Sequence, residues 1–148
     1  MKLFFSAIVS AIMFGSVPVF AGPGLYLKKP ITFPQGEDSV TVARHGVSEE
    51  GSSRCWIVGY RDADGLPGRT LPAGTVVPVH KKESRRLSSD GGGGWYRTSG
   101  VYAWNDDSSD TYRIYVQCTD LYHVIQSFPT AAEAVRLFPE YIQEVKLD

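Results

Sequence analysis

Two cysteines and three histidines are the residues of this chain best suited to metal binding or nucleophilic chemistry. They are Cys55, Cys118, His45, His80 and His123. A structural zinc site needs several such ligands at close spacing, and the histidines do not offer that spacing. The cysteines therefore form either a disulfide or two separate thiols, one of which could act as a nucleophile. The choice depends on the compartment in which the chain folds.

The first 21 residues predict that compartment. Lys2 is followed by an uncharged, mostly apolar run from Leu3 to Val19, and Val19-Phe20-Ala21 places small residues where a signal peptidase cleaves. This pattern indicates a secretory signal peptide, residues 1–21, and an exported domain, residues 22–148. In an oxidising compartment two cysteines predict one disulfide, Cys55–Cys118. The loop-entropy model assigns such a bridge about 4 kcal/mol.

One short run suggests phosphoryl chemistry. A predicted strand ends in Arg44-His45-Gly46, which resembles the opening motif of the histidine phosphatase family. The resemblance would make the histidine the phosphoryl acceptor and would place the arginine on the phosphate oxygens. That family also needs a second histidine, usually just before a glycine, whereas His80 precedes a lysine and His123 precedes a valine. The family's fold also has several helices around an α/β sheet, and the resemblance covers only these few residues.

Two further segments could hold ions or phosphate. Asn105 to Asp110 offers carboxylates in the manner of a calcium loop, but Asp110 stands where an EF-hand needs glycine and Val116 where it needs glutamate. Gly91 to Gly94 has no Lys-Ser or Lys-Thr after it, so it lacks the signature of a phosphate cradle. We expect a hairpin turn and a flexible loop, respectively, with a weak calcium site left open at the first. Neither a Gly-x-Ser-x-Gly nor a His-Glu-x-x-His motif occurs, and no cofactor or metal is predicted.

Aromatic and basic residues gather in the second half of the chain and form our candidate binding surface. Rigid rings beside a basic, glycine-rich loop are typical of recognition surfaces. The segment from Glu49 to Arg54 is a second candidate. The aromatic residues also fit a small β core, and we expect Tyr115 to face outward. The residues chosen for the surface are Lys81, Lys82, Arg85, Arg86, Trp95, Tyr96 and Tyr102.

Alternating apolar and β-branched residues predict several strands and little helix. A lead-in rich in proline and glycine, residues 22–36, holds at most a short strand at residues 31–33. Pro78 places its strand at an edge or breaks it, and a long polar loop follows from Lys81 to Gly94. Ser99-Gly100 predicts a hairpin between two short aromatic strands. The predicted strands are residues 39–43, 55–60, 75–79, 95–98, 101–104 and 111–118.

The strand at 111–118 has the clearest pattern. Tyr112, Ile114, Val116 and Cys118 share one face at period two, and Cys55 shares a face with an isoleucine in its own strand. Both thiols can therefore point into one apolar layer.

The C-terminus predicts helix. Thr130 and Glu133 form a capping box, Pro139 ends or kinks the helix, and Tyr141, Ile142 and Val145 give a second helical piece an apolar side. The expected fold is α+β: a mostly antiparallel β-sheet, sandwich or small barrel with a C-terminal helical segment and one disulfide.

These patterns predict an exported binding protein rather than an enzyme. With 15 basic and 16 acidic side chains the formal net charge is −1, which argues against nucleic-acid binding because such proteins carry basic stripes. No later stretch is long enough to span a membrane. By analogy with small exported proteins that lack a catalytic motif, we expect a protein partner, an enzyme or toxin that this chain inhibits or neutralises, in the periplasm or outside the cell. The alternatives are a glycan-binding module or receptor-binding subunit, and a small secreted hydrolase.

Overall fold

The computed structural model describes residues 21–47, 53–62, 67–89, 95–107, 109–120 and 128–147, and the side chains of residues 47, 53, 85, 86, 88, 89 and 95 lie outside that description. The elements in these ranges are β1 (Gly22–Leu27), β2 (Ile31–Phe33), β3 (Ser39–Val47), β4 (Ser53–Arg61), β5 (Arg69–Leu71), β6 (Val76–Ser89), β7 (Trp95–Trp104), β8 (Tyr112–Asp120), α1 (Ala131–Arg136) and β9 (Ile142–Leu147).

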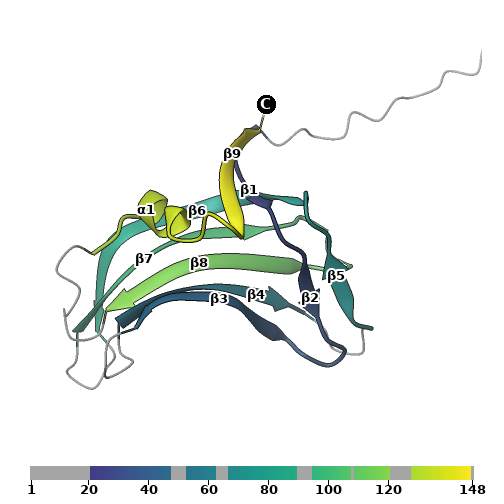
Figure 1. Ribbon diagram of the computed structural model, residues 1–148, viewed down its shortest axis with the longest axis horizontal. Helices are drawn as coiled ribbons and strands as arrows, with labels where there is room; N and C mark the ends of the chain where they lie inside the picture. Colours follow the sequence, from purple (N-terminus) through teal and green to yellow (C-terminus); the bar gives the residue numbers. More distant parts are fainter. Residues whose placement is uncertain are drawn as a thin grey trace, which may run out of the picture.

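Seven of the strands form one curled sheet, open along two edges like half a barrel. Their order is β3-β4-β8-β7-β6-β1-β9, and β2 pairs with β5 in a separate ribbon. Neighbouring strands pair antiparallel throughout. Figure 1 shows the sheet curving from β3 at one side to the upright β1–β9 pair, with α1 beside β6 and β7 and with β2 close to β3 and β4. The mostly antiparallel α+β fold predicted from the sequence is confirmed.

The inner face of this sheet carries the core. Along β8, alternate residues from Tyr112 to Asp120 are buried and those between them are partly exposed. Pairing extends the same face to Ile57 of β4 and Val101 of β7, both fully buried. Phe33 of β2 and Leu71 of β5 pack on it as well. The alternation predicted for this strand is therefore confirmed.

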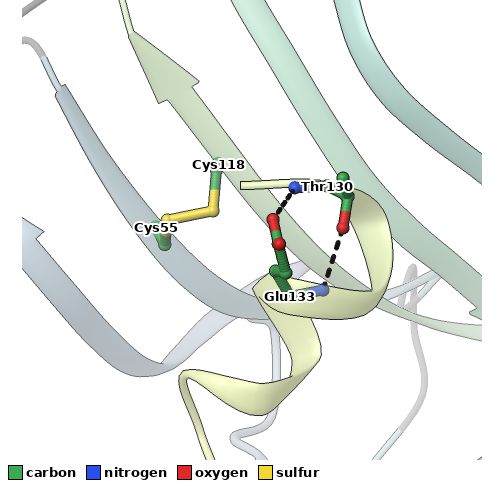
Figure 2. The surroundings of a disulfide bond; sticks show 4 residues. All are labelled: Cys55, Cys118, Thr130 and Glu133. Atoms are coloured by element: carbon green, nitrogen blue, oxygen red, sulfur yellow. Dashed lines mark hydrogen bonds between the residues drawn. A yellow bond between two sulfur atoms is a disulfide. The ribbon is translucent and has the colours of Figure 1, made fainter. Parts of the chain in front are cut away.

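The disulfide joins two central strands on the inner face. Cys55 of β4 lies directly opposite Cys118 of β8, with their Cα atoms 4.0 Å apart. The two residues are 4% and 0% exposed, so the predicted bridge between buried thiols is confirmed. Figure 2 shows it close to the first turn of α1.

The capping box predicted for the helix is also present. The Glu133 amide donates to the Thr130 hydroxyl oxygen at 3.3 Å, and the Thr130 amide donates to the Glu133 carboxylate at 2.7 Å (Figure 2). A third amide of this turn, that of Ala131, donates to the Ser84 hydroxyl of β6 at 2.9 Å. The start of α1 is thereby fastened to the inner face of the sheet. The helix ends at Arg136, before Pro139, as the proline predicted.

The predicted second helical piece is wrong, because Ile142–Leu147 is strand β9. It pairs with β1 over six residues, and Ile142 lies in the core opposite Leu27. Apolar residues three positions apart fit a helix, but six residues are too few to separate the two periods. The backbone of β1 needs a partner on this side, and β9 supplies it. For the same reason the lead-in is more ordered than expected, since Gly22–Leu27 is a full strand.

The loop predicted after Pro78 and the turn predicted at Ser99-Gly100 are also parts of strands. Residues 81–89 of the expected loop belong to β6, which continues through Pro78. Pro78 is the last residue of β6 paired with β1, and Val79 is the first paired with β7. The proline therefore lies where β6 changes neighbours, a position where its missing N–H costs no ladder hydrogen bond. The predicted hairpin at Ser99-Gly100 is absent because β7 runs straight through it.

Candidate functional site

The face opposite the core is a broad aromatic surface. Side chains of a strand alternate between faces, so Trp56, Val58 and Tyr60 of β4 point away from the disulfide side. Among the described elements, α1, β2 and β5 lie on the inner side. We call the opposite side, formed by β3, β4, β8, β7 and β6, the outer face.

A lateral row of side chains crosses four strands of the outer face. Tyr115 of β8 lies opposite Val58 of β4 and opposite Tyr102 of β7, which in turn lies opposite Lys81 of β6. The Tyr115 ring is 5.0 Å from the Tyr102 ring, edge to face, and 5.0 Å from the Tyr60 ring in the next row. Three tyrosine rings thus form one contiguous cluster, which we call the tyrosine cluster.

Gly100 makes room for this cluster. It lies opposite Gln117, and a Cβ atom on it would be 3.0 Å from the Tyr102 hydroxyl oxygen and 2.7 Å from the Val116 carbonyl oxygen. The Tyr102 side chain therefore lies over the glycine, where another residue would carry its own side chain. This close approach explains a glycine within a strand.

A shallow hollow of about 350 Å³ opens beside these rings. Polar groups line it together with aromatic ones, so it offers both flat apolar surface and hydrogen-bonding groups. The lining residues are Tyr60, Lys81, Glu83, Tyr102, Trp104, Tyr115 and Gln117.

Cationic groups surround the tyrosine cluster. The Lys81 ammonium lies 5.7 Å from the centre of the Tyr102 ring and 2.8 Å from a Glu83 carboxylate oxygen. Arg113, in the same lateral row as Tyr60, lies 3.6 Å from a carboxylate oxygen of Asp62. Both partners of the Arg113–Asp62 pair are exposed, so this pair contributes little to stability.

Further along β4, Arg54 lies over the Trp56 ring at 5.3 Å. At the β6 side, the His80 and Trp104 rings stack at 4.2 Å. Arginine and tryptophan are among the residues enriched at binding surfaces.

The sequence-predicted surface residues divide between the two faces. Lys81 and Tyr102 meet on the outer face, and Tyr96 shares that face by alternation along β7. Lys82 is on the other side of β6, where it forms an ion pair with Glu144 of β9. The side chains of Arg85, Arg86 and Trp95 and the glycines at 91–94 lie outside the described residues, as do residues 49–52 of the second candidate segment.

Sequence reasoning left Tyr60, Tyr115 and Gln117 out of the predicted surface. Alternation within a strand indicates that Tyr115 faces outward, and this is what the structure has. The neighbours of Tyr115, however, depend on the order of strands in the sheet, which a single sequence does not reveal.

The Arg44-His45-Gly46 motif lies near the end of β3. In the register of β3 with β4, Arg44 lies opposite Trp56 and His45 opposite Cys55, so the arginine and the histidine point to opposite faces. Both residues nonetheless line one open hollow of about 290 Å³, together with residues 137–141. His45 contacts the Phe138 ring edge to face at 6.2 Å, and His123 lies outside the described residues.

Two carboxylates of the predicted turn, those of Asp107 and Asp110, are already engaged. Hydrogen bonds from the Ser109 hydroxyl and amide lower the pKa of Asp107. Asp110 accepts from Arg61 Nε at 2.9 Å and also pairs with Arg69. These interactions, the one with Arg61 first, lower the pKa of Asp110. Among the residues that the structure describes, no group of three or more His, Cys, Asp or Glu side chains could hold a metal ion.

Comparison of the chain with protein-family models, curated proteins and solved structures gave no match. In the described ranges, no helix is long and apolar enough to cross a membrane.

Proposed function

We propose that this chain is an exported, non-enzymatic binding protein that recognises another protein through the tyrosine cluster and inhibits or neutralises it. The observation that carries the proposal is the contact between the Tyr60, Tyr115 and Tyr102 rings on the sheet face opposite the core. A buried disulfide fits a chain that folds in an oxidising compartment.

The chemistry of the face favours a protein partner with acidic and apolar groups. Tyrosine rings lose little conformational entropy on binding, and tyrosine, tryptophan and arginine are the residues that most often dominate binding energy. Arg54 and Arg113 stand near opposite ends of the paired part of β4 and β8, and Arg113 lies directly opposite Tyr60. Guanidinium groups there suit carboxylates on the partner.

The experiment is affinity capture from the native compartment followed by a titration with the purified partner. Tyr102→Ala and Tyr115→Ala should each weaken binding by roughly 30-fold or more, the loss expected for a central hot spot. Tyr26→Ala is the matched control, because Tyr26 is a 36% exposed tyrosine on β1, away from the cluster. Equal effects of all three substitutions, or no partner in the native compartment, would contradict the proposal.

A second experiment distinguishes a glycan ligand from a protein partner. Aromatic rings beside Gln117 and Glu83 also suit a sugar, whose hydroxyl groups need hydrogen-bonding partners. A glycan array probed with the protein and with Tyr102→Ala tests this directly. Glycan binding that is lost in the variant, without any protein partner, would replace the proposal by the glycan-binding alternative.

A further inference from the structure

The two edges of the seven-stranded sheet differ in how they could accept another strand. β3 is interrupted by register shifts between Thr41 and Ala43 and between His45 and Val47, and its Gly46 has a φ of 65°. Irregularities of this kind prevent edge-to-edge pairing. The other edge, β9, pairs with β1 over six consecutive residues without a shift, so its outer edge is regular.

The hydrogen bonds of β1 show which backbone groups of β9 point outward. The Leu27 amide donates to the Thr75 carbonyl at 2.9 Å, and the Leu27 carbonyl accepts from Gly74, so the polar groups of Leu27 face β6. Alternate residues of a strand direct their backbone polar groups to opposite sides, so the backbone groups of Gly24 and Tyr26 face β9. Gly24 is paired with Val145, and Tyr26 is paired with Gln143. The amides and carbonyls of Glu144 and Lys146 therefore point away from β1, toward the outer edge.

These two residues carry opposite charges, and this makes the edge self-complementary. We propose that the chain forms a symmetric dimer in which β9 pairs antiparallel with β9 of a second copy, centred on Val145. Glu144 then lies opposite Lys146 of the second copy, and the same pair recurs on the other side of the two-fold axis. Each pair exchanges two backbone hydrogen bonds and also brings opposite charges together.

The neighbouring registers of the β9–β9 pair do not place opposite charges across from each other. Centring the pair on Glu144 places that carboxylate opposite itself, and centring it on Lys146 places the ammonium opposite itself. Like charges directly opposite each other destabilise a strand pair. Glu144 also pairs with Lys82 of its own chain, and its side chain remains 30% exposed.

The side chains on the outer side of this edge suit the same contact. Val145 would meet Val145 of the second copy at the axis. A contact of one strand per copy is small, so the dimer should be reversible and dependent on concentration.

Analytical ultracentrifugation of the purified protein over a concentration series tests the dimer, and paired charge changes test its register. Lys146→Glu and Glu144→Lys should each weaken self-association about tenfold or more, since attraction becomes repulsion at two symmetric positions. Mixing the two variants should restore dimers, because each then presents the charges that the other lacks. Lys81→Glu makes the same charge change on the outer face and should leave the dimer intact.

Amide hydrogen exchange tests the strand pairing residue by residue. The amides of Glu144 and Lys146 should exchange more slowly as protein concentration rises, while those of Gln143 and Val145 are protected already. Lys146→Pro removes an outward donor without touching a hydrogen bond to β1, and should abolish the concentration dependence. A monomer at every concentration, a dimer insensitive to the charge changes, or no heterodimer on mixing would overturn the proposal.

Discussion

Replacing Asp110 with asparagine should destabilise the protein by about 2 kcal/mol. The Arg61 side chain is only 4% exposed and donates Nε–H to Asp110 at 2.9 Å and Nη1–H to the Pro67 carbonyl at 2.7 Å. Leaving a buried charge without its partner costs about 3–5 kcal/mol. Because Asp110 is 21% exposed and asparagine keeps one acceptor oxygen, we expect about half of that.

Urea denaturation followed by tryptophan fluorescence measures this change. With a slope of about 2 kcal/mol per molar urea, the midpoint should fall by roughly 1 M. Asp106→Asn is the matched control, since that carboxylate is 72% exposed and lies 3.9 Å from His80. Its midpoint should stay close to that of the unmodified protein.

The stability difference should also depend on pH, with a sign set by the pKa of Asp110. Arg61, with Arg69, holds this pKa below the ordinary value of 3.8 in the folded state. The ion pair therefore contributes fully above pH 3.8 and loses its contribution as the pH falls through the lower, folded-state pKa. The midpoints of the protein and of Asp110→Asn should converge on acidification below that value.

Two results would refute this reasoning. One is a shift for Asp110→Asn no larger than that of the control, which would mean that Arg61 finds another partner at little cost. The other is a difference that stays constant as the pH falls below 3.8, the ordinary pKa, because a charge-based contribution must disappear when the carboxylate is protonated.

Three further predictions concern the disulfide, strand β7 and the helix. The buried Cys55–Cys118 disulfide should resist reductant in the folded protein, whereas reductant added after denaturation should release two thiols that a thiol assay detects. Replacing both cysteines by alanine should cost about 4 kcal/mol in urea denaturation. Gly100→Ala should cost about 1–3 kcal/mol in the same assay, because the added carbon would be 2.7 Å from the Val116 carbonyl oxygen and the backbone must shift. Thr130→Ala should cost about 1 kcal/mol, since it removes the hydroxyl of the capping box, and a change below 0.3 kcal/mol would contradict that role.

Features that depend on neighbours in sequence were predictable. The alternation along β8, the capping box of α1 and the end of that helix before Pro139 all follow from residues within one or two turns or one strand. The disulfide was predictable for another reason, since two cysteines in a chain expected to be exported leave one simple pairing. Each of these is confirmed by the structure.

Features that depend on a distant partner were not predictable. Ser99-Gly100 has the composition of a turn, and β7 continues through it because β6 and β8 pair with it there. Ile142–Leu147 is a strand because β1 lies beside it, and nothing in those six residues reveals β1. The basic run after Pro78 looks like a loop until β7 provides a partner for its backbone.

The candidate site also depends on residues that are distant in sequence, and its geometry depends on the disulfide. Cys55 and Cys118 are directly opposite on β4 and β8, and the next pair of the same ladder is Trp56 with Gln117. The bridge on the inner face therefore holds together the two strands whose outer residues carry Tyr60 and Tyr115. Covalent linkage limits the relative motion of these strands, so the rings are held in register before any partner arrives. A binding surface arranged in advance loses less entropy on association, so under the proposed function the buried disulfide would serve recognition as well as stability.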